Sequence, residues 1–208
     1  MVEGRLSRRA PSSSSSGTAT RALRVVVVDH YDSYTWNLVH LVAAVTGELP
    51  DVVEHDRVQA SDLTGFSHVV LSPGPGHPED PADFGVGREL LLAARGPVLG
   101  VCLGMQGLVA AYGGRVAAVE PAHGEVSSVT HDGTGLFDGV PSPFDVVRYH
   151  SLAAVEVPDV LRVTARSEDG VVQAVVHRSL PLCGVQFHPE SVLTSHGVRL
   201  VENFLAGR

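Results

Sequence analysis

The chain has 208 residues, of which 44% are hydrophobic, and its 23 acidic residues outnumber 15 basic ones to give a formal net charge of -8. This length and apolar content support one hydrophobic core, and the acidic balance argues against nucleic acid or an acidic membrane surface as a partner. The two cysteines, Cys102 and Cys183, provide no disulfide framework, and no apolar run approaches the roughly 18 residues of a membrane span, so we expect a cytoplasmic protein without membrane contact.

Residues 1–22 differ in composition from the rest of the chain. They contain five consecutive serines, from Ser12 to Ser16, together with several arginines and no stretch that could form an apolar face. Such a segment cannot bury enough apolar surface to fold. We therefore predict a disordered tail over residues 1–22 and one domain over residues 23–208.

The first half of the chain alternates apolar strands with helical patterns. The run over residues 25–28 is apolar throughout, as expected for a strand covered on both faces. Ser33 is predicted to cap the first helix. Further strands are expected at 52–54, 68–71 and 98–101, and helices at 34–45, 84–95 and 105–112. This alternation predicts an α/β fold with a doubly wound, mainly parallel, flavodoxin-like sheet, in which ligands bind at the carboxyl ends of the strands.

The second half of the chain has a different pattern. Short β-prone runs are separated by turn residues such as Asp132-Gly133 and Asp169-Gly170, which are typical of hairpins. The runs lie at 116–119, 126–129, 144–149, 161–164, 171–176 and 182–187. We expect them to add antiparallel strands to the sheet, and we expect a final helix over residues 194–205.

One predicted strand end carries a pattern suited to a nucleophile. Cys102 follows the apolar run 98–101 and is framed by Gly100 and Gly104. In a nucleophile elbow a strand turns sharply into a helix, and a side chain at either glycine position would collide across the turn. Unpaired N–H groups at the helix N-terminus would favour the thiolate form of the cysteine. Because free cysteines are often buried and inert, the pattern by itself also fits a structural cysteine.

A second predicted strand end is followed by the loop Ser72-Pro73-Gly74-Pro75-Gly76. Its prolines restrict the backbone, and its glycines allow a ligand to approach the backbone closely. Such a loop can present a well-aimed N–H group, although an ordinary connection from strand to helix would show the same residues.

A third motif places a histidine and a carboxylate two residues apart. On an extended backbone His188 and Glu190 project to the same side and can hydrogen-bond. A histidine oriented by a carboxylate is the general-base half of a catalytic triad, and a surface ion pair is the alternative. The other histidines that we considered show no metal-ligand spacing, so no metal site is predicted: His123, His131, His150 and His177.

Together and in this order, the three motifs resemble those of class I glutamine amidotransferases, the type with a Cys-His-Glu triad. Within that class the chain is most similar to the glutaminase subunit of anthranilate synthase (component II) and aminodeoxychorismate synthase. The match covers about residues 23–205. The closer similarity is carried by residues 32–35 with Asn37, and by residues 72–76, 148–152 and 184–191.

The resemblance implies a role for each matching residue. Cys102 is the nucleophile, His188 acts as base and then as acid, and Glu190 orients His188. The backbone N–H groups of Gly74 and Leu103 form the oxyanion hole, and an elbow does place such a donor directly after its nucleophile. Four residues stand where the family binds glutamine: Gly76, Gln106, Ser151 and Leu152.

The activity implied by the resemblance is hydrolysis of L-glutamine through a γ-glutamyl thioester. The ammonia passes to a chorismate-binding synthase subunit, in a heterodimer or larger complex, that makes aminodeoxychorismate or anthranilate. No cofactor is implied in this chain, and any Mg²⁺ belongs to the partner. Because the chain ends directly after its last predicted helix, we expect that partner to be a separate subunit, with a natural fusion as the alternative.

Other functions also fit the residues. The chain could serve another acceptor synthetase, act as a non-catalytic assembly or regulatory partner of the same fold, or work alone as a cysteine hydrolase. Three residues depart from the usual pattern of chorismate-linked subunits: Met105 replaces a common His, His30 a common Asn, and Glu125 a common Lys. None belongs to the triad, so these departures concern the identity of the partner.

Overall fold

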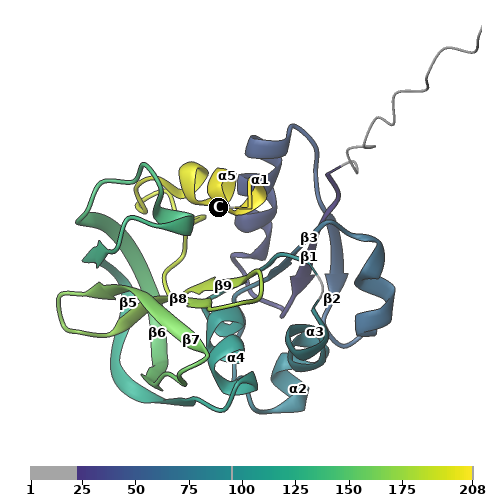
Figure 1. Cartoon of the computed structure of the whole chain (residues 1–208), viewed down its shortest axis with the longest axis horizontal. Helices are drawn as coiled ribbons and strands as arrows, with labels where there is room; N and C mark the ends of the chain where they lie inside the picture. The colour runs from purple at the N-terminus through teal and green to yellow at the C-terminus, as the bar shows by residue number, and fades with distance from the viewer. Residues whose placement is uncertain (1–22, 95, 208) are drawn as a thin grey trace, which may run out of the picture.

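The computed structural model describes residues 23–94 and 96–207, so the tail predicted over residues 1–22 lies outside the described residues. Within the described part, nine strands form one sheet in the order β2-β1-β3-β4-β9-β8-β7-β5-β6. Neighbours from β2 to β9 are parallel, and neighbours from β9 to β6 are antiparallel. The predicted α/β sheet with additional antiparallel strands in the second half is therefore confirmed (Figure 1).

The parallel strands are short: β1 (Val25–Asp29), β2 (Asp51–Glu54), β3 (His68–Leu71), β4 (Val98–Val101) and β9 (Leu182–Val185). All of them are mostly buried except β2, which lies at the edge of the sheet. In β1, Val25 and Val27 join the hydrophobic cluster on one face of the sheet, while Val26 and Val28 join the cluster on the other. Both faces are covered, so every position in the strand favours an apolar side chain. This explains why the run does not alternate with polar residues.

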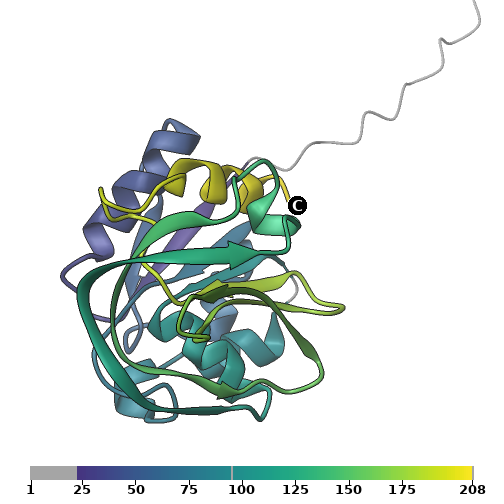
Figure 2. The ribbon, with the colours of Figure 1, turned by 90° about the vertical axis from the view of Figure 1, so that its left-hand side faces the viewer.

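Helices cover both faces of the parallel strands, as Figures 1 and 2 show. On one face lie α1 (Thr35–Thr46), α5 (Gly197–Leu205) and the short 3₁₀ helix η2 (Gly135–Phe137). On the other lie η1 (Ala60–Gly65), α2 (Pro81–Phe84), α3 (Gly87–Ala93) and α4 (Leu103–Ala111). Two hydrophobic cores, one on each face, thus fix the sheet and the positions of its strand ends. No helix in the described ranges is both long and apolar enough to cross a membrane.

Most of the antiparallel strands are longer than the sequence pattern predicted: β5 (Arg115–His131), β6 (Phe144–Glu156) and β7 (Leu161–Ser167). Strand β8 (Val172–His177) has the predicted length and is displaced by one residue. The prediction of two separate runs at 116–119 and 126–129 was wrong, because β5 continues through both. Its pairing with β6 shifts register between Ala118 and Ala122 and again between His123 and Glu125. Such irregularities insert unpaired residues and break the alternation that marks a strand in a sequence.

Three helix predictions are corrected as well. The helix predicted over 84–95 is divided into α2 and α3 at Gly85, which has a φ of 47°. A side chain there would also collide with His55, so the break depends on glycine. The N-cap of α1 is Tyr34 and not Ser33, and the Tyr34 N–H donates to the Asp32 carboxylate at 2.7 Å. The last helix begins at Gly197 instead of residue 194.

Candidate active site

Cys102 occupies the sharp turn between β4 and α4. Its φ of 51° and ψ of -101° are unusual for a residue with a side chain, and such conformations persist where the surrounding structure enforces them. A Cβ atom on Gly100 would lie 2.4 Å from the backbone of Gly104, and one on Gly104 would lie 2.6 Å from the carbonyl oxygen of Leu71. The turn therefore has no space for side chains at either glycine, as predicted for an elbow.

The nucleophile turn is joined to β9. Val101 pairs with Val185 in the parallel ladder, and the Cys102 N–H donates to the Val185 carbonyl at 2.8 Å. The chain that continues from Val185 therefore runs beside the turn. This register brings His188 to the cysteine, although the two residues are far apart in sequence.

His188 and Glu190 form a buried pair. Nδ1 of His188 lies 2.6 Å from Oε1 of Glu190, and the His188 side chain is only 3% exposed. The backbone of His188 is anchored to β6, because its N–H donates to the carbonyl of Val147 at 3.1 Å. The carbonyl of His188 accepts from the hydroxyl of Thr194 at 2.7 Å. The predicted hydrogen bond across two residues is present, and it is buried instead of lying at the surface.

The electrostatics of His188 favour its charged form. Burial alone would lower its pKa, but interactions with Cys102 and Glu190 outweigh burial and raise the pKa to about 10. Apart from the interaction with Cys102, the Nε2 atom of His188 has no hydrogen-bond partner among the described residues, which leaves it available for proton transfer. An imidazolium beside a cysteine thiolate is the form in which a Cys–His pair is a reactive nucleophile.

Two tyrosine rings lie against the same imidazole. The rings of Tyr149 and Tyr34 stand edge-on to His188, with centroids 5.3 Å and 5.7 Å away, and their own centroids are 5.1 Å apart. Both tyrosines lie within segments that match the family, and no role was predicted for them. One stands before α1 and the other in β6, so two separate elements pack a ring against the buried imidazole.

The two predicted oxyanion donors lie together. A Cβ atom on Gly74 would lie 2.7 Å from Cδ2 of Leu103, so the loop after β3 packs directly against the start of α4. Leu103 is the first residue of that helix, where a backbone N–H has no acceptor within the helix. The structure thus brings the loop and the elbow into contact beside the nucleophile.

Of the four predicted glutamine-binding residues, only Gln106 and Leu152 are hydrogen-bonded to each other in the described structure. Gln106 is buried in α4, and its Nε2 atom donates to the carbonyl of Leu152 in β6 at 2.9 Å. Gly76 and Ser151 are exposed, on the loop after β3 and on β6, so their assignment rests on the resemblance alone. Sequence analysis gave no role to Gln186, whose Nε2 atom lies 3.5 Å from Sγ of Cys102. Its position two residues before His188, on the same side of an extended chain, is the signal that could have found it.

The structure shows what surrounds each of the three residues that depart from the family pattern. Met105 is fully buried against Gly184, where a Cβ atom would lie 2.8 Å from that of Met105. Glu125 accepts from the buried guanidinium of Arg148 at 2.8 Å. His30 is stacked between His55 and Phe84, with 5.1 Å between ring centroids on each side, and its burial lowers its pKa to about 3.

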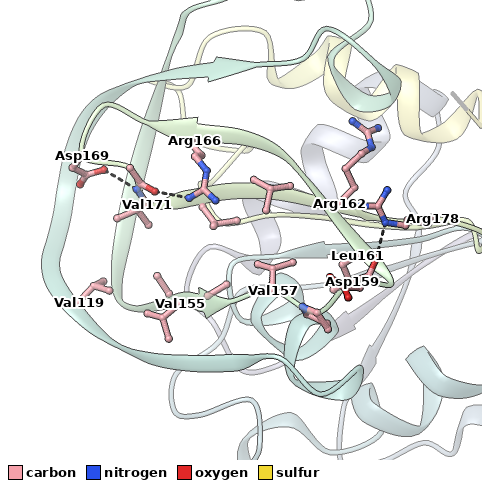
Figure 3. Close-up of a pocket in the computed structure, with 16 residues that line it drawn as sticks. Val119, Val155, Val157, Asp159, Leu161, Arg162, Arg166, Asp169, Val171 and Arg178 are labelled. Atoms are coloured by element: carbon pink, nitrogen blue, oxygen red, sulfur yellow. Dashed lines mark hydrogen bonds between the residues drawn. The ribbon is translucent and has the colours of Figure 1, made fainter.

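A hollow of about 570 Å³ lies elsewhere, among β6, β7 and β8 (Figure 3). None of the predicted site residues lines it. Two of its arginines bond to nearby carbonyls, Arg166 to Gly170 at 2.7 Å and Arg178 to Asp159 at 2.6 Å. In the described residues no group of three or more His, Cys, Asp or Glu side chains is arranged to hold a metal ion.

A buried Cys–His–Glu arrangement at the strand ends of an α/β sheet defines an enzyme that transfers acyl groups through a cysteine. The family described as glutamine amidotransferase class-I matches residues 26–207, so the chain belongs to this family and is a glutamine amidotransferase.

Relatives agree with this membership, and a solved structure shares the fold. The chain is 54% identical over 185 residues to an aminodeoxychorismate synthase of Streptomyces griseus, covering 88% of this chain and 26% of the relative. It is 42% identical over 191 residues to an anthranilate synthase component 2 of Methanothermobacter marburgensis, covering 87% of this chain and 97% of the relative. A glutamine amidotransferase structure from Thermotoga maritima shares the fold, with a TM-score of 0.73 and 17% identity over 88% of this chain and 96% of that one.

Proposed function

We propose that this chain hydrolyses L-glutamine and delivers the ammonia to a chorismate-using synthase. The observation that carries the proposal is the buried His188–Glu190 pair, 2.6 Å apart, beside a cysteine in a strained elbow. A non-catalytic domain has no need to keep a nucleophile, a charged base and an orienting carboxylate together in one buried site.

The proposed reaction begins with attack of the Cys102 thiolate on the side-chain amide carbon of glutamine. The N–H groups of Gly74 and Leu103 stabilise the oxyanion, and loss of one such donor typically raises a barrier by about 2.7–4 kcal/mol. His188 gives its proton to the departing nitrogen, so that ammonia leaves and a γ-glutamyl thioester remains. Neutral His188 then takes a proton from water, the resulting hydroxide attacks the thioester, and glutamate leaves as the thiolate is restored.

Glu190 supports both steps, because its carboxylate stabilises the imidazolium and holds Nδ1 of the ring. Gln106 and Leu152, which are hydrogen-bonded to each other, are assigned to the wall that holds glutamine, together with Gly76 and Ser151. The reaction uses side chains and backbone groups of this chain and calls for no cofactor. Any requirement for Mg²⁺ is assigned to the synthase.

The assignment of the partner rests on the relatives. The matching region forms 26% of the Streptomyces aminodeoxychorismate synthases and 97% of the Methanothermobacter anthranilate synthase component 2. The same unit therefore occurs both within a long chain and as nearly the whole of a short one. We infer that this chain works with a chorismate-binding synthase, as a separate subunit or as part of one polypeptide, to make aminodeoxychorismate or anthranilate. Both cysteines are free thiols, which fits a cytoplasmic location.

Replacement of the nucleophile tests the proposal. With the synthase present, Cys102→Ser should abolish product formation from glutamine and leave formation from added ammonia unchanged. Cys183→Ser is the matched control and should retain both activities, because burial raises the pKa of the Cys183 thiol to about 12 and keeps it unreactive. Persistence of the glutamine-dependent activity in Cys102→Ser, or loss of both activities, would contradict the assigned roles. Product formation from an acceptor other than chorismate would show that the partner is a different synthetase.

A further inference from the structure

The side chain of Gln186 is buried beside the nucleophile and has no role in the mechanism above. It lies just past the end of β9 and is 0% exposed. One end of its amide, Nε2, lies 3.5 Å from Sγ of Cys102, and the other end, Oε1, lies 3.2 Å from Nε2 of Gln106. A primary amide can donate at one end and accept at the other, so its orientation decides whether it supports or opposes a thiolate.

The neighbouring groups determine this orientation. The Leu152 carbonyl oxygen can only accept, so the Gln106 atom that lies 2.9 Å from it must be the NH₂ nitrogen. The same NH₂ group faces Gln186, so the Gln186 atom on that side must be the acceptor oxygen. The NH₂ group of Gln186 is therefore directed at the sulfur. This assignment follows from a backbone carbonyl at one end of the chain of hydrogen bonds and needs no assumption about Cys102.

We propose that Gln186 is a catalytic residue that donates an N–H to the sulfur of Cys102 and stabilises its thiolate, and that Gln106 is the positioning residue that fixes the direction of this donor. The proposal deepens the glutaminase mechanism and rests on Cys102 as its nucleophile. It adds a neutral donor to a site whose other thiolate-stabilising group, His188, changes its charge during the reaction.

The two groups have different uses. His188 gives its proton to the departing ammonia, so its positive charge is absent from the formation of the thioester until the ring takes a proton from water. The amide of Gln186 keeps its protons throughout the reaction. It can therefore donate a hydrogen bond to the sulfur again when the thiolate leaves the acyl group. Hydrogen bonds to ionised groups are stronger than neutral ones, and burial strengthens them further.

The network also connects the nucleophile to the wall assigned to glutamine. Leu152 lies in β6, Gln106 in α4 and Gln186 after β9, so the hydrogen bonds link three separate elements to the sulfur through Gln186. The ionisable groups around this point are His188 with Glu190, the tyrosines Tyr34 and Tyr149 against the His188 ring, and His150, whose pKa burial and Arg148 lower to about 4. The variants below leave all of these groups in place.

Alkylation of Cys102 by iodoacetamide as a function of pH tests the proposal, because only the thiolate reacts. Gln186→Met keeps a similar length and removes the donor, and it should shift the midpoint of the alkylation profile upward by about one pH unit. Gln106→Met does not touch the sulfur but frees the Gln186 amide to rotate, and it should cause a smaller shift in the same direction. A Cys102→Ala protein provides the background from Cys183.

Gln173→Met is the matched control. Gln173 is equally buried, in the neighbouring strand β8, but its amide bonds to Ser167 and not to Cys102, so the midpoint should not move. A Gln186→Met midpoint equal to that of the unchanged protein, or an equal shift in Gln173→Met, would overturn the proposal. If Gln186→Met does not fold, the Gln106→Met profile decides, and an unshifted midpoint there counts against it. The assay reads the thiol directly, so its result is independent of whether Cys102→Ser abolishes glutamine hydrolysis.

Discussion

The parallel and antiparallel halves of the sheet contribute to the site in different ways. The residues proposed to act on glutamine stand at the carboxyl ends of parallel strands: Gly74 after β3, Cys102 after β4 and His188 after β9. The antiparallel half supplies side chains and carbonyls from within a strand, as Tyr149 and Leu152 in β6 show. A strand end is shaped by its own turn, whereas a position within a strand depends on pairing with its neighbours. The local sequence therefore shapes each of these turns, whereas the positions of Tyr149 and Leu152 depend on how the strands pair.

Gly100→Ala should have the largest effect, because its methyl group would collide with backbone in the elbow of the parallel half. The added methyl group would lie 2.4 Å from the backbone of Gly104, which cannot move away as a flexible side chain could. We expect a loss of at least about 3 kcal/mol in the free energy of unfolding, measured by denaturant titration. Gly96→Ala is the control, since its methyl group would come no closer than 3.4 Å to Ser67. Equal stability of the two variants would show that the elbow is not crowded in solution.

Glu190→Gln should have the next largest effect. The raised pKa of His188 contributes stability that is complete below the unfolded value of 6.5 and is lost as pH rises through about 10. Without the carboxylate this contribution shrinks, so the variant should be less stable than the unchanged protein at pH 6 and should approach it near pH 10. Glutamine hydrolysis should fall by about a hundredfold or more. Glu202→Gln, which alters an exposed ion pair with Arg199, should change neither quantity, and a similar loss there would point to a general charge effect.

A smaller effect is expected on the pH dependence of stability, and it should differ between His30 in the parallel half and His150 in the antiparallel half. Burial, together with the nearby charge of His55 or Arg148, lowers their pKa values to about 3 and about 4. Both lie below the unfolded value, so the unfolded chain binds more protons and stability falls as pH drops from 6.5 towards 4. His30→Phe and His150→Phe should each make the melting temperature less dependent on pH in this range, with the larger change for His30. Unchanged slopes in both variants would mean that neither histidine is buried as a neutral ring.

The smallest effect is expected in the hollow of the antiparallel half. Arg166→Ala and Arg178→Ala remove exposed side chains that bond to nearby carbonyls and touch none of the catalytic groups. The ratio kcat/KM for glutamine should stay within about twofold, because surface changes of this kind are usually worth less than about 0.5 kcal/mol. A tenfold fall would show that this half takes part in the chemistry as well as in forming its surroundings.

The elements of the parallel half were predicted more accurately from the sequence than those of the antiparallel half. The strands His68–Leu71 and Val98–Val101 have the predicted bounds, because a short apolar run between turn residues has few other structures to adopt. The continuous strand β5 was missed because its irregular register hides the alternation of side chains. The helix break at Gly85 was missed because its reason, the closeness of His55, lies in another part of the chain.

The same division applies within the site. The His188–Glu190 bond could be predicted because two residues on an extended chain point to one side. Gln186 could have been found as a candidate from its position two residues before His188, but its contact with Cys102 depends on the placement of β9 beside β4. The contact of Gln106 with Leu152 depends on the placement of α4 beside β6.

The sequence by itself determined which residues can form the turn and the pair: glycines around Cys102, where any side chain would collide, and a histidine two residues from a carboxylate. These constraints act between near neighbours in the chain, so they can be read without the fold. Only the tertiary structure decided that the turn and the pair meet, through the pairing of Val101 with Val185, and that they meet in a buried place. Burial is what makes the charges of His188 and Glu190 and the amide of Gln186 effective at the sulfur, because water no longer screens them.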